Sequence, residues 1–147
     1  MNEKKEMINT PQNTARVTRT VSVTKEEFSE TENYLKSYGF YKKLLKLDRY
    51  EQDYFGADLY GTRSVYEYHG EISLAHAKMF EVRHFIMMMQ NSDEKLLLYH
   101  HYVRGESVER CAELLGMSRS SAFRLKKRAL TLAAEAYSER AKKNGKS

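Results

Sequence analysis

Residues 108–127 read VERCAELLGMSRSSAFRLKK, and this segment carries more information about the fold than any other part of the chain. It predicts two short helices joined by a tight turn. Ala112 is small enough to let the helices approach each other, and Gly116, four residues later, suits a turn with a positive φ. Apolar residues flank both points and predict a sealed helix pair: Cys111, Leu115, Met117, Ala122 and Leu125. The pattern is typical of a helix-turn-helix, and a generic helical hairpin is the alternative.

The second helix of this pair is expected to direct a basic face outward when Ala122 and Leu125 turn inward. Arginine can contact guanine bidentately in the major groove of DNA, and a helix N-terminus attracts phosphate. We therefore expect base contacts from Arg119, Ser120, Ser121 and Arg124. The candidates for phosphate contacts are Ser118, Phe123, Lys126, Lys127 and Arg128.

The distribution of charge agrees with a polyanion contact in this region. The chain has 147 residues and a net charge of +5. Residues 1–92 hold 13 basic and 13 acidic residues, whereas residues 93–147 hold 12 basic and 7 acidic residues, so the whole excess lies in the C-terminal part. Residues 119–128 contain five basic residues and no acid. A local basic cluster favours nucleic-acid binding, although a solvated helix face would look the same.

Capping signals divide the C-terminal part into helices. Asn91 and Ser92 are candidate caps for a helix that ends near Gly105, and Ser107 is a candidate cap for the next helix, which Gly116 ends. Ser118 is the candidate cap of a last long helix that runs to about Arg140. A basic C-terminal tail is expected at residues 142–147.

The N-terminal part is also predicted to be helical. Thr24 and Glu27 form a capping box, and apolar residues then recur at helical spacing as far as residue 45, with Gly39 as an interruption. Residues 56–70 hold three glycines and are predicted to be a loop. A second helix is expected from about residue 71 to 90, with a seven-residue repeat that could pack on the first helix or on another copy. Eight of the eleven tyrosines lie in residues 34–68. They could form an interaction surface, or they could belong to the core of the small helices. Residues 1–23 are expected to be a flexible tail; residues 17–23 alternate like a strand but have no partner strand.

Three segments of the C-terminal part resemble region four of bacterial sigma factors. They are residues 94–107 (EKLLLYHHYVRGES), residues 112–118 (AELLGMS) and residues 123–130 (FRLKKRAL). In that family the domain binds the −35 promoter element. The order of a helical N-terminal part and this C-terminal domain is similar to that of ArpU-type regulators of late transcription in phages and prophages. The resemblance implies a role in transcription and places Arg119, Ser120, Ser121, Arg124 and Arg128 at DNA.

Several other classes of protein are not indicated. The single cysteine excludes an intramolecular disulfide and a Cys-rich zinc site, and the five histidines lack metal-ligand spacing. No carboxylate pair or phosphate-binding loop is recognisable, so we expect no enzyme, no metal, no cofactor and no small-molecule substrate. No apolar run approaches the roughly 20 residues of a membrane span, and no secretory signal is recognisable, which predicts a cytoplasmic, nucleoid-associated protein.

The sequence as a whole predicts an all-α protein. Its expected parts are a flexible tail at 1–23, a helical interaction or dimerisation region at 24–90 (with a helical hairpin as one option), a DNA-binding helix-turn-helix domain at 91–141, and a basic tail at 142–147. The predicted function is sequence-specific regulation of transcription on double-stranded DNA, with RNA polymerase and a second copy of the chain as further candidate partners. The alternatives are a module that docks on RNA polymerase or on a sigma antagonist, and a small DNA-packaging subunit of the terminase type.

Overall fold

The protein is all-α, as predicted. The computed structural model describes residues 23–55 and 65–145, and within these residues it contains no strand. The elements are α2 (Lys25–Phe55), α3 (Val65–Met87), α4 (Ser92–Leu98), a short π-helix η2 (Tyr99–Val103), α5 (Val108–Leu115) and α6 (Arg119–Gly145).

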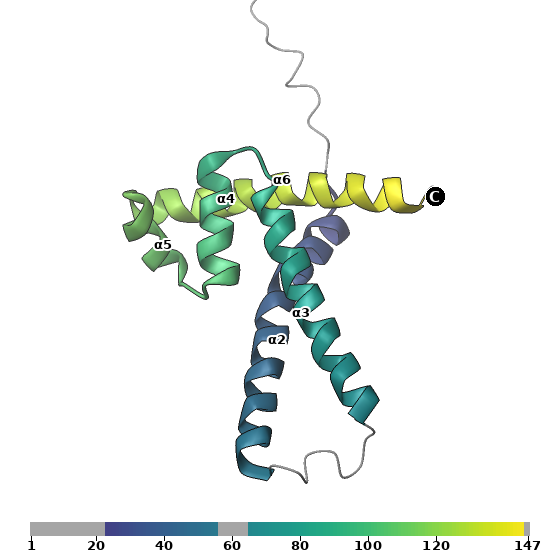
Figure 1. Cartoon of the computed structure of the whole chain (residues 1–147). Coiled ribbons are helices and arrows are strands. Elements are labelled where there is room, and N and C mark those ends of the chain that lie inside the picture. Colours follow the sequence, from purple (N-terminus) through teal and green to yellow (C-terminus); the bar gives the residue numbers. More distant parts are fainter. Residues whose placement is uncertain (1–22, 56–64, 146–147) are drawn as a thin grey trace, which may run out of the picture.

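The helices form an arm and a head, as Figure 1 shows. Helices α2 and α3 run in opposite directions and pack together as an arm. Of the two arrangements that the seven-residue repeat allowed, packing on the first helix or on another copy, this is the first. Helix α6 crosses the upper end of the arm, and α4 and α5 pack against the N-terminal half of α6. The first turns of α2 lie beside the C-terminal half of α6, so that α6 contacts both the head and the arm.

The capping box predicted at the start of α2 is present. The backbone N–H of Thr24 donates to Oε1 of Glu27, and the N–H of Glu27 donates to Oγ1 of Thr24, each at 3.0 Å. These reciprocal bonds satisfy two of the free N–H groups at the helix start. Helix α2 then continues through Gly39 without a break.

One hydrophobic core joins the arm to the head. Its fully buried members include Leu35 of α2, Ile86 of α3, Leu97 and Leu98 of α4, Cys111 of α5, and Ala129 and Ala133 of α6. The core is therefore continuous across residue 91, where the sequence predicts a domain boundary. A smaller cluster of Val108, Ala112 and Ala122 seals α5 against α6.

Two predicted element boundaries differ from the structure. Helix α3 begins at Val65, inside the predicted loop at 56–70, and residues 56–64 of that loop lie outside the described residues. A helical glycine such as Gly70 costs about 1 kcal/mol, which the packing of α3 on α2 can offset. Helix α6 continues to Gly145 instead of ending near Arg140, so residues 142–145 of the predicted basic tail are helical. The distal half of α6 contacts α2, and Lys142 and Lys143 in its last turn interact favourably with the helix dipole. The predicted tail at 1–23 lies outside the described residues apart from Val23.

The cap predicted for the third helix also differs in detail. Asn91 precedes α4 in an extended conformation, but its side chain makes no capping hydrogen bond. The backbone carbonyl of Asn91 instead accepts from the N–H of Lys95 at 2.9 Å. Asp93 and Glu94 in the first turn provide the favourable charge at this helix start.

Candidate nucleic-acid interface

The turn between α5 and α6 has the local geometry that its residues predict. Gly116 adopts φ 68° and ψ 37°, in the left-handed region that favours glycine. The N–H of Met117 donates to the carbonyl of Ala112 at 2.9 Å, which is the six-to-one hydrogen bond of a Schellman motif. The turn therefore ends α5 and fixes the direction in which α6 begins.

Serine caps secure both helices of this pair. Oγ of Ser107 accepts from the N–H of Arg110 at 3.0 Å at the start of α5. Oγ of Ser118 accepts from the N–H of Ser121 at 3.1 Å at the start of α6. Each cap satisfies a backbone donor that the helix itself cannot pair, and both were predicted from the sequence.

Small buried side chains hold α5 and α6 close together. Ala122 is fully buried and Ala112 is buried, with Met117 packed beside them. Leu125, one turn after Ala122 on α6, and Cys111, next to Ala112 on α5, belong to the main core. The inward face predicted for the second helix is therefore correct. Burial also raises the pKa of the Cys111 thiol, in keeping with a packing role.

The outward face of α6 carries most of the predicted contact residues. Five of the candidates are exposed along the first three turns of α6: Arg119, Ser120, Phe123, Arg124 and Lys127. Ser118, immediately before α6, and Arg128 are also exposed, whereas Ser121 and Lys126 are half-buried at the edges of this face. We call this set of nine residues the α6 basic face. The structure brings all nine onto one end of one helix.

Three of the predicted base-contacting residues, Arg119, Ser121 and Arg124, interact with neighbouring side chains. Nη2 of Arg124 donates to Oγ of Ser121 at 3.1 Å, so the hydroxyl of Ser121 is used within the helix. Nε of Arg119 donates to Oε2 of Glu109 on α5 at 3.1 Å, and its guanidinium lies over the Phe123 ring at 5.6 Å from the ring centroid. The Arg119 side chain nevertheless remains 72% exposed. An exposed pair of this kind contributes little to stability.

Arg128 has a firmer partner in the head. Its Nε donates to Oε2 of Glu94 on α4 at 2.8 Å, and the Glu94 side chain is only 11% exposed. Sequence reasoning missed both Glu94 and Glu109. Glu109 lies ten residues from Arg119 and Glu94 lies 34 residues from Arg128, separations for which helical periodicity gives no signal.

A polar cluster of Tyr34, Glu81 and Arg140 fixes α6 to the arm. Glu81 on α3 accepts from Oη of Tyr34 at 2.9 Å and from Nη2 of Arg140 at 2.8 Å. Arg140 also donates from Nη1 to Oη of Tyr34 at 3.2 Å. Burial raises the pKa of Tyr34 to about 12. Burial also acts to raise the pKa of Glu81, but the hydrogen bonds from Tyr34 and Arg140 outweigh it, so the pKa of Glu81 lies below its ordinary value.

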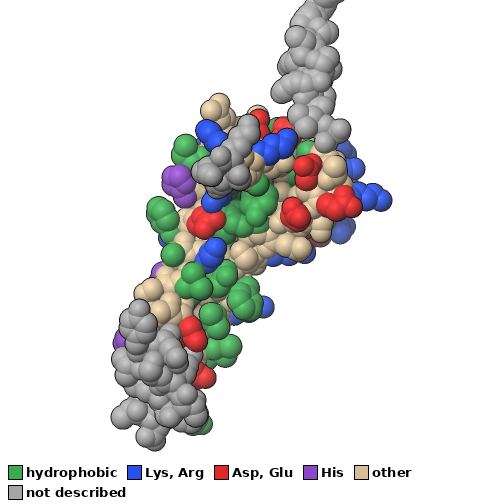
Figure 2. Space-filling view, turned by 90° about the vertical axis from the view of Figure 1, so that its right-hand side faces the viewer, with side chains coloured by type: hydrophobic (Ala, Val, Ile, Leu, Met, Phe, Trp, Pro, Cys, Tyr) green, Lys and Arg blue, Asp and Glu red, His purple; other side chains and the backbone are tan. Residues whose placement is uncertain are grey.

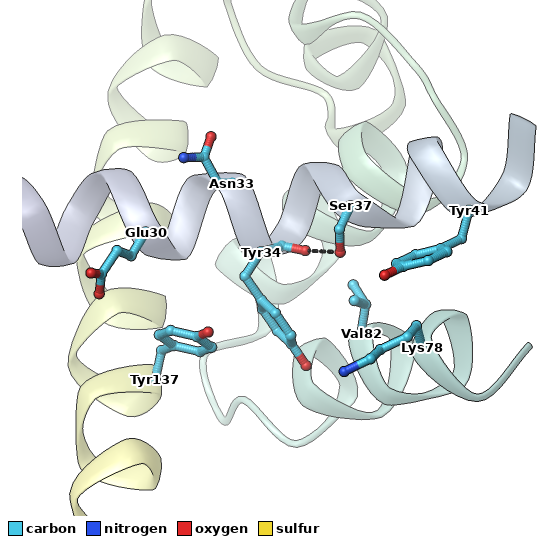
Figure 3. A pocket seen from close by; sticks show the side chains of 8 residues that line it. All are labelled: Glu30, Asn33, Tyr34, Ser37, Tyr41, Lys78, Val82 and Tyr137. Carbon is cyan, nitrogen blue, oxygen red and sulfur yellow. Dashed lines mark hydrogen bonds between the residues drawn. The ribbon is translucent and has the colours of Figure 1, made fainter. Parts of the chain in front are cut away.

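A pocket lies beside this cluster, where α2, α3 and α6 meet. Its volume is about 400 Å³, and Figure 3 shows the side chains that line it. Tyr34 and Tyr137 form its aromatic side, and Lys78 and Glu30 bring opposite charges to its rim. The α6 basic face is not part of this lining, so the pocket belongs to the junction between arm and head.

A second, more apolar groove of about 560 Å³ lies between α3 and the helices α4 and η2. Phe80, Met87 and Leu96 supply apolar walls, and each of these side chains is at least 42% exposed. Five basic or imidazole side chains line the same groove, and none of the described residues that line it is acidic: Arg83, His84, Lys95, His100 and Arg104. The groove is therefore both apolar and basic.

Among residues 23–55 and 65–145, no group of three or more His, Cys, Asp or Glu side chains is placed to hold a metal ion. None of the described helices combines the length and the apolar character that crossing a membrane requires. Comparison of the chain with protein families, with characterised proteins and with solved structures gives no match.

Proposed function

We propose that this protein binds double-stranded DNA in a sequence-specific way and regulates transcription, with the N-terminal half of α6 in the major groove. The observation that carries the proposal is the α6 basic face, where nine predicted contact residues share one end of one helix. A helix with its side chains is about 10–12 Å wide, which fits the major groove of about 12 Å.

The support around α6 suits such a contact. The N-terminal half of α6 packs on α4 and α5 in the head. The C-terminal half is hydrogen-bonded to the arm through Arg140 and Ser138. Oγ of Ser138 donates to Glu27 at 3.0 Å. A recognition helix held at both ends presents its side chains without further ordering, which lowers the entropic cost of binding.

The residues of the α6 basic face divide into two proposed roles. Arg119, Ser120, Ser121 and Arg124 lie in the first two turns and contact bases. The phosphates that flank the groove are contacted by Lys126, Lys127 and Arg128, which lie one turn later on α6. Phosphate contacts are also assigned to Ser118 and Phe123, on the same DNA strand. Contacts to bases give sequence preference, whereas contacts to phosphates give affinity that falls with salt.

The wider biological setting belongs to the same proposal. The resemblance of residues 94–130 to region four of bacterial sigma factors supports a regulator of transcription, encoded by a phage or prophage and acting at the bacterial nucleoid. RNA polymerase is then a natural second partner, because one helix-turn-helix buries too little DNA surface for high specificity alone.

Selection of bound sequences from random double-stranded DNA tests this function. The expected result is an enriched motif of a few base pairs, which the Arg124→Ala variant selects less sharply. The matched control is Lys142→Ala, which alters a basic residue at the far end of the same helix and should leave the selected motif unchanged. Enrichment of no motif above background by the unaltered chain would overturn the proposal.

A second candidate function is a module that docks on RNA polymerase or on a sigma antagonist. The apolar groove lined by Phe80, Met87 and Leu96 favours it, because its basic rim is complementary to an acidic amphipathic segment. This function predicts weak, sequence-blind DNA binding together with a polymerase complex that Leu96→Glu disrupts. If the Leu96→Glu variant still formed the complex, the groove would not be the docking site.

A further inference from the structure

The outer face of α2 carries a row of exposed apolar side chains. The row consists of Phe40, Leu44, Leu47, Tyr50 and Tyr54, with exposed fractions of 62%, 38%, 59%, 59% and 86%. Steps of four, three, three and four residues place them on one face of the helix. Figure 2 views the molecule from the side on which α3 lies in Figure 1, and on that side too hydrophobic side chains reach the surface of the arm.

This row lies on the side of α2 that faces away from α3. Tyr38 is buried and Tyr41 and Leu45 are half-buried, and these residues belong to the face that packs in the arm. At 100° per residue, the exposed row points about 150° away from the buried face. Helix α2 is therefore apolar on two sides, although a surface helix needs only one apolar face.

The exposed row is symmetric about Leu47. Leu44 and Tyr50 lie three residues on either side of it, and Phe40 and Tyr54 lie seven residues on either side. Two residues of opposite charge are also placed symmetrically about Leu47. Lys43 lies four residues before it and Glu51 four residues after it, and both are exposed.

We propose that a second copy of this chain packs its α2 antiparallel on this row, with Leu47 on the two-fold axis. The pairing places Phe40 against Tyr54 of the partner, Leu44 against Tyr50, and Lys43 against Glu51. Each contact occurs twice, because the interface of a two-fold dimer uses the same patch on both copies. The contact extends over residues 40–54, a length of about 21 Å.

The charges favour a second copy in this orientation over other occupants. A parallel pairing would set Lys43 against Lys43 and Glu51 against Glu51, so it would be repulsive at both positions. The antiparallel pairing turns both positions into opposite-charge pairs. An unrelated partner would have no reason to match a pattern that is complementary to itself.

Charge reversal on the full chain tests the pairing, with sedimentation velocity as the measurement and circular dichroism as the check of folding. The unaltered chain is expected to dimerise. Lys43→Glu and Glu51→Lys each create two like-charge contacts, and each is expected to weaken the dimer about tenfold. The double variant carrying both changes should recover the affinity of the unaltered chain.

A mixture gives the sharpest result. Equimolar Lys43→Glu and Glu51→Lys chains are expected to form a heterodimer more tightly than either forms a homodimer, since every facing pair then has opposite charges. The matched control is Lys42→Glu, the same charge change at a residue about 200° round the helix from Phe40, which should dimerise like the unaltered chain.

A charged substitution at Leu47 tests the position of the two-fold axis. Leu47→Glu sets two carboxylates against each other on the two-fold axis and should give a monomer, whereas Leu114→Glu, a matched change at an exposed leucine of α5, should not. Three results would each overturn the proposal: a monomeric unaltered chain, a mixture that associates no better than its components, or dimerisation that Leu47→Glu leaves intact. None of these measurements involves DNA, so they are independent of the proposed function.

Discussion

Nε of Arg128 on α6 donates a hydrogen bond to Oε2 of Glu94 on α4 at 2.8 Å. The Glu94 side chain is 11% exposed and that of Arg128 is 58% exposed, so a nearly buried carboxylate is neutralised by a cation at the edge of the α6 basic face. Arg128 thereby connects the packing of the head with the proposed DNA contact, and the two contributions can be separated by experiment.

Replacement of Glu94 by glutamine is expected to lower the free energy of unfolding by about 1–2 kcal/mol. This figure is the usual value for a hydrogen bond between charged groups, reduced because Arg128 is exposed to solvent. Urea unfolding provides the measurement, with Glu139→Gln on the exposed side of α6 as the control. Equal stability of the two variants would show that the pair contributes nothing to the fold.

Arginine and lysine on the α6 basic face are expected to have different effects on DNA binding. Arg124→Ala should cost about 1–3 kcal/mol on the selected sequence and little on unrelated DNA. Lys127→Ala should weaken binding to both DNAs and reduce the salt slope by about 1. Gel shifts at several salt concentrations measure both effects, and unchanged affinity in both variants would show that another face binds DNA.

The carboxylate of Glu109 is expected to oppose DNA binding, because it pairs with Arg119 at 3.1 Å and would lie near phosphates. Glu109→Gln should therefore tighten binding about two- to fivefold at low salt, from roughly 0.5–1 kcal/mol for an exposed pair. The gain should shrink as salt screens the charges. Glu139→Gln again serves as the control, and weaker binding by Glu109→Gln would mean that the carboxylate positions Arg119 for contact.

Acid is expected to weaken the attachment of α6 to the arm through Glu81. Its folded pKa lies below the ordinary value of 4.5, so its contribution to stability is complete above that pH and is lost as the pH falls through the folded pKa. Glu27 titrates in the same direction, since the backbone N–H of Thr24 lowers its pKa. Glu81→Gln should flatten the loss of stability below about pH 4.5 without removing it. Urea unfolding between pH 6 and pH 3, roughly the range around these pKa values, measures this, and parallel curves for the variant and the unaltered chain would contradict the expectation.

Much of the local structure was predictable because its causes lie within a few residues of each other. The capping box of Thr24 and Glu27, the serine caps at Ser107 and Ser118, and the left-handed turn at Gly116 each depend on a contact over five residues or fewer. The inward face of α6 was predictable for the same reason, since helical spacing alone places Ala122 and Leu125 together.

The element boundaries were less predictable because tertiary packing moves them. Glycines at 56, 61 and 70 indicated a loop, yet α3 continues back through Gly70 to Val65, where it is part of the arm. Helix α6 likewise extends beyond its predicted end, because its distal half contacts α2 and is held by Arg140 and Ser138. Intrinsic propensity is a weak signal that such contacts override.

The sequence by itself therefore determined the helical class, the caps, the turn at Gly116 and the face of α6 that turns inward, because a helix repeats every 3.6 residues and its ends need local partners. Only the tertiary structure decided that Glu94 neutralises Arg128, that Glu81 joins Tyr34 to Arg140, and that α2 retains a second apolar face. Those relationships join residues between 34 and 106 positions apart, or depend on which side of a helix its neighbours cover. Periodicity shows that a face is apolar, but the packing of the other helices decides whether that face is buried.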